Sequence, residues 1–411
     1  MSTLEVLSVL VATAALFGWI SSRVLRVPLT IGTMLLTVLT SLSLSGLAWL
    51  TPGLHTWTVN LVKQIDFESL ILHGMLPLLL FAGAFLLDLE QLVREKLPVA
   101  LLSVVGTVLS VFAVAALMKL VSGTGVPWME CLIFGALISP TDPIAVLEML
   151  RRVGIPKPIK AQLAGESLFN DGIGAVLFLT MLEIARGHAP TPWHIAGMLL
   201  LKAGGAILLA ILAAWVISQL ICLVDAYQVE ILLTLTLALG GYVLADIWHL
   251  SAPLEAVVAG IALRHFNRNQ PQGRITDDRL DEFWTLVDEV QNSLLFVLLG
   301  LEAMVVTLNM TTLRAGMAAL LSVNSVRFAV VALCLIPLRI CQSKRPTSIL
   351  TLAWGGLRGG LSIALALSVP EAFGRSWIFG ATYIVVVFSI ILQGGSLNLM
   401  LSWRERRRLA A

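Results

Sequence analysis

Long apolar stretches recur along the chain and are separated by short polar segments. A bilayer core about 30 Å thick needs roughly 20 consecutive, mostly apolar residues for each helix that crosses it. Such stretches predict an all-α membrane protein with about 13 transmembrane helices, whose boundaries are good to about four residues. The predicted spans are 4–22, 28–50, 70–88, 98–120, 127–149, 161–184, 194–221, 228–247, 251–264, 285–308, 315–338, 347–369 and 378–402.

The composition agrees with this pattern. Of the 411 residues, 58% are hydrophobic and 13% are charged, and the mean hydropathy is +0.92. This balance excludes a soluble globular protein. The first stretch lacks a basic segment before it and a small-residue cleavage site after it, so we interpret it as a span and not as a secretory signal. The four cysteines have no metal-ligand spacing and predict neither a disulfide framework nor a zinc site.

The basic residues predict the orientation of the chain. If the N-terminus lies outside, nineteen of the 27 basic residues fall in cytoplasmic segments and five in outer ones. The positive-inside rule then predicts an outer N-terminus and a cytoplasmic C-terminus. Three basic residues remain at membrane depth: Lys202, Arg327 and Arg358.

One membrane domain accounts for nearly the whole chain. We expect a transmembrane domain over residues 1–403, with a core bundle that includes 127–184 and 315–369, and a short basic cytoplasmic tail over 404–411. The longest cytoplasmic loop is predicted over 264–283, which holds about twenty residues of mixed charge.

Two spans in corresponding places of the two halves are interrupted. The fifth contains "SPTDP", and the twelfth, "LAWGGLRGGLSIALALSVP", has four glycines around Arg358. Because a proline has no N–H, Pro140 frees the carbonyl of Ala136 and Pro143 frees that of Ser139. Such carbonyls are tolerated at membrane depth only against protein, water or a ligand. Paired broken helices indicate a transporter with inverted repeats and a site near the bilayer midplane.

A polar face follows on the next span. Ser167, Asn170, Asp171 and Gly174 have the i, i+3, i+4, i+7 spacing of one helical face, and Glu166 lies beside it. A carboxylate at the centre of a membrane helix costs roughly 2.5 to 3.5 kcal/mol on insertion scales. The sequence therefore predicts that these acids and Asp142, in the preceding break, have a use.

Structural explanations remain open for each feature taken alone. The glycines of the twelfth span would suit close helix packing, and Thr141 or Asp142 would suit the cap of a turn at the membrane boundary. Glu166 would suit a structural partner for a buried arginine, and Asp171 a hydrogen-bonded structural acid. A boundary turn does not explain the polar face on the following helix.

The motifs resemble those of the sodium/proton exchangers of the monovalent cation:proton antiporter-1 family, including the bacterial NhaP type. The matching stretches are "ISPTDPIAV", "GESLFNDGIGAVLF", "LLFVLLGLEA" and "WGGLRGGLSIALAL", in the family's order and spacing. The resemblance implies the antiporter fold, in which two unwound helices cross. It also implies exchange of Na⁺ or Li⁺ for H⁺ by a homodimer in the cell inner membrane, with no cofactor and no nucleic-acid partner.

The resemblance also implies roles for the polar residues. Asp171 would bind either the cation or a proton, with Ser167 and the Thr141 backbone completing the shell around Na⁺, and Asn170 would steady Asp142. Glu166 would pair with a membrane arginine, for which Arg327 and Arg358 are both candidates; we favour Arg327 there and Arg358 for the half-helix ends. The cation- and proton-binding set is Asp171, Asp142, Thr141 and Ser167, and the supporting set is Asn170, Glu166, Arg327 and Arg358.

Two positions bear on the transport properties. Many relatives have an acid within the stretch that is Phe81, Ala82 and Gly83 here, so cation preference among sodium, lithium and potassium stays open. Electrogenic relatives have an aspartate where this chain has Asn170, which implies electroneutral 1:1 exchange.

Rival functions remain to be weighed. A potassium/proton antiporter on the same fold is the strongest. An intramembrane aspartic protease is remote, because its acids lie in "YD" and "GxGD" motifs whereas these lie in "PTDP" and "FNDG". A channel would need repeated selectivity-filter elements, which the sequence does not show.

Overall fold

The structure is a computed structural model that describes residues 3–25, 27, 29–47, 66–142, 146–147, 156–187, 192–224, 226–268, 273–304, 306, 309–341 and 349–396. Within these ranges the chain is helical, and its β-type pairing is a single isolated antiparallel bridge between Asp142 and Leu357. The all-α fold class is therefore confirmed.

Each predicted span coincides with helix in the described part of the chain. Seven helices there are long and apolar enough to cross a membrane, and three shorter apolar helices accompany them. The total of thirteen spans stays a prediction. The main helices are α1 (Thr3–Ile20), α2 (Leu29–Leu47), η2 (Leu70–Met75), α5 (Leu76–Phe85), α6 (Leu89–Arg94), α7 (Lys96–Ala100), η3 (Leu101–Gly106), α8 (Thr107–Ser122), α9 (Trp128–Ile138), α11 (Lys157–Ala185), α12 (Pro192–Cys222), α13 (Tyr227–Ile247), α14 (Ala252–Arg268), α15 (Gly273–Leu301), η5 (Glu302–Met304), α16 (Met310–Cys341), α17 (Ile349–Trp354), α18 (Gly360–Leu367), α19 (Arg375–Phe388) and η7 (Ser389–Gly394).

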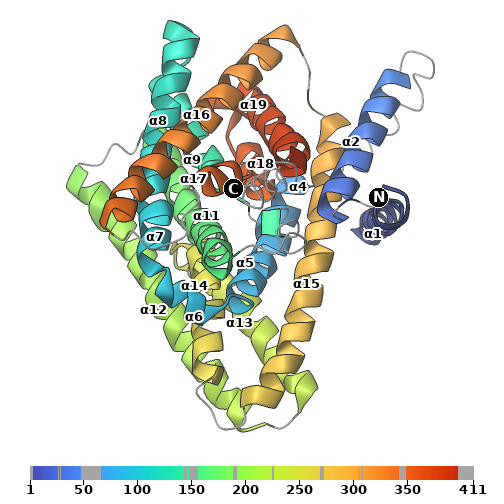
Figure 1. Cartoon of the computed structure of the whole chain (residues 1–411), viewed down its shortest axis with the longest axis vertical. Helices are drawn as coiled ribbons and strands as arrows, with labels where there is room; N and C mark the ends of the chain where they lie inside the picture. Colours follow the sequence, from blue (N-terminus) through green and yellow to red (C-terminus); the bar gives the residue numbers. More distant parts are fainter. Residues whose placement is uncertain are drawn as a thin grey trace, which may run out of the picture.

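The helices form two groups that meet along α11. Helices α8, α9, α16, α17, α18 and α19 pack on one another, and α11 packs on α9; we call these the core group. Helices α1, α2, α5, α12, α13, α14 and α15 form a second set of contacts, which we call the scaffold group. Figure 1 shows α11 near the middle of the molecule, with α15 along one side and α1 and α2 beyond it. Because α11 also packs on α14, it joins the two groups.

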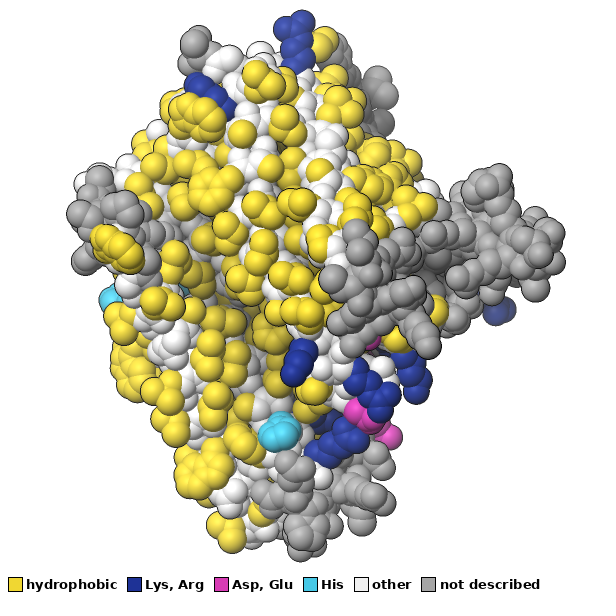
Figure 2. Space-filling view, turned by 60° about the vertical axis from the view of Figure 1, so that its left-hand side comes forward, with side chains coloured by type: hydrophobic (Ala, Val, Ile, Leu, Met, Phe, Trp, Pro, Cys, Tyr) yellow, Lys and Arg dark blue, Asp and Glu magenta, His cyan; other side chains and the backbone are white. Residues whose placement is uncertain are grey.

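The surface is apolar over wide areas, as a bilayer requires. Figure 2 shows one face largely covered by hydrophobic side chains, with most of its charged side chains in the lower part of the view. Large side chains such as Leu200, Trp215 and Leu232 are exposed on the outside of the scaffold group. Since exposed apolar patches of this extent are rare on soluble proteins, the outer surface is one that lipid covers.

The predicted loop over 264–283 is wrong. Helix α14 continues to Arg268 and α15 begins at Gly273, so helix occupies most of this range. Arg264 donates two hydrogen bonds to the Asp281 carboxylate, at 2.6 and 2.9 Å, and so ties the ends of the two helices together. Arg279 and Glu282 of α15 are exposed while Leu280 is fully buried, as expected at the end of an amphipathic helix.

Trp284 packs α15 against its neighbours α5 and α13 within the scaffold group. Its side chain is 0% exposed, its ring centroid lies 4.7 Å from that of Phe81, and its Nε1–H donates to Thr234 Oγ1 at 3.3 Å. A buried tryptophan removes a large apolar area from solvent, and its N–H usually finds a hydrogen-bond partner, as it does here.

We predict that Trp284→Ala lowers the free energy of unfolding by about 3–5 kcal/mol, the usual cost of emptying a large aromatic site. Thermal unfolding in detergent measures this effect. Trp193→Ala is the matched control, because Trp193 is 88% exposed, and its melting temperature should stay near that of the wild type. Equal losses in the two variants would contradict the packing role of Trp284.

Candidate ion-binding site

The first break follows α9. The helix ends at Ile138, and Ser139 to Asp142 continue without helical structure. Residue 143 is a proline and cannot donate an N–H to the Ser139 carbonyl. The segment 139–142 therefore leaves backbone oxygens that need donors from elsewhere in the fold.

The second break lies between α17 and α18, over residues 355–359. It crosses the first break directly, because the Asp142 N–H donates to the Leu357 carbonyl at 2.7 Å. The Asp142 carboxyl lies against the backbone of Gly359, where any side chain would overlap it. Glycine is needed at 359 because the two segments approach closely at this point. The carboxyl of Asp142 thus faces the N-terminal end of α18, where the helix dipole favours negative charge.

Arg358 supplies donors to the broken end of α9. Its Nη1 donates to the carbonyls of Ser139 and Pro140, the latter at 3.0 Å. The carbonyl that Pro143 leaves free is therefore satisfied by a guanidinium from the other break. The backbone N–H of Arg358 donates to Ser389 Oγ on η7 at 2.9 Å, and this hydrogen bond holds the arginine in place.

The carbonyls at the end of α17 are also satisfied. Arg327 on α16 donates to the Leu352 carbonyl at 3.0 Å, and Gln393 on η7 donates to the Trp354 carbonyl at 2.7 Å. Arg327 also forms a bidentate ion pair with Glu166 on α11, in which Nη2 donates to Oε2 at 3.0 Å. Both side chains are buried. Arg327 and Arg358 were both candidates for pairing with Glu166, and in the structure the partner is Arg327.

A hydrogen-bonded group of α11 side chains fixes the first break. The Asn170 amide donates to Thr141 Oγ1 at 2.7 Å, and Asn170 Oδ1 accepts from the Thr141 N–H at 3.2 Å. Ser167 Oγ lies 3.0 Å from Thr141 Oγ1. Both described hydrogen bonds of Asn170 end on Thr141, so it holds the unwound segment one residue earlier than the residue expected from sequence, Asp142. Gly174 allows α11 to approach Pro140 closely.

A cavity of about 330 Å³ leads to this crossing. Asp142 and Asp171 face it together with Thr141, and both carboxyl side chains are partly exposed to it. The two carboxylates lie close enough to interact electrostatically, and Arg358 interacts with Asp171. Charged and polar side chains farther along the wall come from α6, α11 and α15: Asp88, Gln91, Lys157, Lys160 and Asp288.

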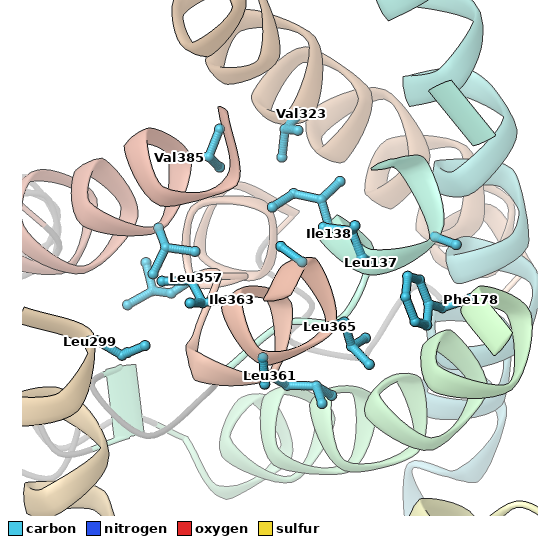
Figure 3. Close-up of a cluster of buried hydrophobic side chains, with 14 of the residues drawn as sticks. Leu137, Ile138, Phe178, Leu299, Val323, Leu357, Leu361, Ile363, Leu365 and Val385 are labelled. Atoms are coloured by element: carbon cyan, nitrogen blue, oxygen red, sulfur yellow. The ribbon is translucent and has the colours of Figure 1, made fainter. Parts of the chain in front are cut away.

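Dense apolar packing surrounds the crossing on the side away from the cavity. Figure 3 shows Leu137 and Ile138 at the end of α9 beside α18, with Val323 and Val385 close by. Phe178 on α11 is also fully buried in this cluster. In such surroundings an unpaired polar group is costly, so the polar side chains are confined to the crossing and the cavity.

The structure brings all the expected site residues to one place. Thr141, Asp142 and Asp171 line the cavity, Ser167 and Asn170 hold Thr141, and the two arginines bind carbonyls of the breaks. Gly83, from the stretch of residues 81–83 that bears on cation preference, also lines the cavity. Pro143 and the basic tail 404–411 lie outside the described residues.

Four residues at the site could not be recognised from the sequence. Asp288 brings a further carboxylate to the cavity wall, and Ser362 on α18 brings a buried hydroxyl that has no hydrogen-bond partner among the described residues. Ser389 and Gln393 hold the second break. Asp288 lies in the predicted span 285–308, where no role was assigned to it, and the others carry no local signal.

The site differs from that of a resident metal. In the described part of the chain, no group of three or more His, Cys, Asp or Glu side chains is arranged to hold a metal ion. What converges here is two carboxylates with hydroxyl and carbonyl oxygens. Such oxygen ligands suit a hard cation.

The chain matches known proteins over nearly its whole length. Residues 11–403 match the family described as "Sodium/hydrogen exchanger, transmembrane". The chain is 38% identical over 404 residues to a protein of Pseudomonas aeruginosa named Na(+)/H(+) antiporter NhaP, covering 96% of this chain and 95% of that protein. It is 33% identical over 345 residues to the Na(+)/H(+) antiporter NhaH of Halobacillus dabanensis, covering 81% and 82%.

A solved structure shares the fold. The sodium proton antiporter MjNhaP1 from Methanocaldococcus jannaschii, determined at pH 8, superposes with a TM-score of 0.75 at 20% identity and covers 98% of this chain and 99% of its own. With two crossed broken helices, a buried acid on the helix beside them and a family match over residues 11–403, the chain belongs to the transmembrane sodium/hydrogen exchanger family.

Proposed function

We propose that this protein exchanges Na⁺ or Li⁺ for H⁺ across a membrane, with the cation and the proton competing for Asp171. The observation that carries the proposal is the arrangement of Asp142 and Asp171 in one cavity, at the point where the two unwound segments cross. The relatives above are named Na⁺/H⁺ antiporters, which supports sodium over potassium.

The chemistry of the crossing favours competition at Asp171. Asp142 lies at the N-terminal end of α18, whose dipole balances a negative charge there. Asp171 stands on an intact helix and faces the cavity, so it gains most from a bound cation. When the cation leaves, a proton takes its place, because a bare carboxylate beside Asp142 is repelled. Thr141 and Ser167 would add oxygen ligands to the cation.

The charge balance supports electroneutral 1:1 exchange. Asn170 is neutral and uses its amide to hold Thr141, so it takes no proton. Arg327 is already paired with Glu166. One carboxylate, Asp171, then alternates between one cation and one proton, and the loaded site carries the same charge in both forms.

Transport proceeds by alternating access, in which the core group moves against the scaffold group. The cavity opens toward the N-terminal end of α11, where Lys157 and Lys160 line it. By the positive-inside rule this end would be cytoplasmic, which supports an inward-facing state in the inner membrane, with the N-terminus outside. As in the family it resembles, the protein would act as a homodimer.

The first prediction from the proposed function concerns Asp171. Asp171→Asn should abolish cation-dependent proton flux in reconstituted liposomes, because an amide cannot alternate between a cation and a proton. The matched control is Asp246→Asn, which changes an exposed acid on α13 and should exchange at the wild-type rate. Comparing Na⁺, Li⁺ and K⁺ in the same assay separates sodium from potassium exchange. Undiminished flux in a well-folded Asp171→Asn variant would refute the proposal.

A second prediction concerns Asn170. Wild-type exchange should not respond to an imposed membrane potential, because no net charge moves. In Asn170→Asp a second titrating carboxylate stands beside Asp171, so part of the flux should become dependent on potential. Proton flux with the membrane potential clamped by valinomycin and K⁺ measures both. Potential-dependent exchange by the wild type would contradict the 1:1 stoichiometry.

A third prediction separates residues that hold the site from those that bind the ion. Glu166 is 1% exposed and pairs with Arg327. Glu166→Gln removes this carboxylate, so the charge of Arg327 stays buried without a partner of opposite charge. Such a loss costs about 3–5 kcal/mol, so the melting temperature in detergent should fall well below that of Asp171→Asn. If the two variants melt together, the Glu166–Arg327 pair does not brace the site.

A further inference from the structure

Glu255 is a buried acid that the site described above does not use. It lies in the first turn of α14, is 0% exposed, and neither carboxyl oxygen has a hydrogen-bond partner among the described residues. Its carboxyl rests on Gly241 of α13, where any side chain would overlap it. A carboxyl in this condition calls for an explanation, since buried polar groups are almost always satisfied.

Its position relates it to the ion site. Leu254, the residue before it, packs on Gly172, which directly follows Asp171 on α11. No described residue of α14 lines the cavity, so the contact between α11 and α14 separates Glu255 from the cavity. Glu255 therefore lies just behind the surface along which the core group meets the scaffold group.

Glu255 also lies toward the face of the molecule opposite the cavity mouth. At the C-terminal end of α11, Glu183 forms an ion pair with Lys202 of α12 at 2.7 Å. The Ser251 N–H donates to the Lys202 carbonyl at 3.2 Å, and the Ser251 carbonyl accepts from the Glu255 N–H at 2.9 Å. Glu255 is thus about one helical turn from the face opposite the cavity mouth.

We propose that Glu255 is an ion-contacting carboxyl of the pathway that opens on the face opposite the cavity. The inference rests on the proposed function, because it requires the core group to move against the scaffold group. When α11 withdraws from α14, the Gly172–Leu254 contact opens, and water or the cation reaches the two oxygens that are unsatisfied here. The carboxyl then attracts Na⁺ on its way to or from Asp171. The charged neighbours at this end, Lys202 and Glu183, already neutralise each other.

Cysteine accessibility tests the placement without relying on transport. In a background in which the four native cysteines are replaced by alanine, Glu255→Cys should react with a membrane-impermeant methanethiosulfonate from the face opposite the cavity. Ala164→Cys, on the cavity wall, should react from the cavity face. Leu237→Cys, buried on α13, should stay unreactive. Reaction of Glu255→Cys only from the cavity face, or from neither face, would overturn the inference.

Transport kinetics test the role of the carboxyl. Glu255→Gln should still exchange Na⁺ for H⁺. Its KM for Na⁺ should rise severalfold when Na⁺ is presented at the face opposite the cavity. At the cavity face the KM should stay within about twofold of the wild-type value. The matched control is Glu302→Gln, an equally buried acid on η5 that should show no such asymmetry. Equal KM values for Glu255→Gln and the wild type at both faces would contradict this inference but not the proposed function. Absence of exchange in the wild type would contradict the proposed function.

Discussion

The rest of the structure depends on the hydrogen bonds by which Arg358 joins the two broken helices. Two helices lose their regular hydrogen bonding inside an apolar protein, and each freed carbonyl needs a donor there. Arg358 comes from one break and donates to the Ser139 and Pro140 carbonyls of the other. The same segments share a backbone hydrogen bond from Asp142 to Leu357. Neither break would be stable without the other, so the crossing behaves as one unit.

The crossing explains how acids at this depth are retained. The positive guanidinium, the N-terminal end of α18 and the amide of Asn170 surround Asp142 and Thr141 with donors and partial positive charge. The hydrogen bonds and charges that stabilise the crossing therefore come from residues other than Asp171. That carboxyl remains on the wall of the cavity, where a cation or a proton can reach it. This arrangement supports the proposal that Asp171 is the carboxylate at which cation and proton exchange.

Features with a local cause could be predicted from the sequence. Prolines 140 and 143 and the glycines around Arg358 mark the breaks, and the spacing of Ser167, Asn170 and Asp171 marks one helical face. What depends on distant partners could not be predicted. Ser389 and Gln393 reach the second break from η7, and Asp288 reaches the cavity from α15. The charged range 264–283 was mistaken for a loop because pairing such as Arg264 with Asp281 is invisible without the fold.

The central claim is that a cation and a proton exclude each other at Asp171, and calorimetry measures this most directly. Na⁺ is titrated into the purified protein in two buffers of different ionisation enthalpy, and the difference in heat gives the number of protons released for each ion bound. The account predicts about one proton released per Na⁺ and no heat of binding in Asp171→Asn. Saturable Na⁺ binding that releases no proton would contradict it.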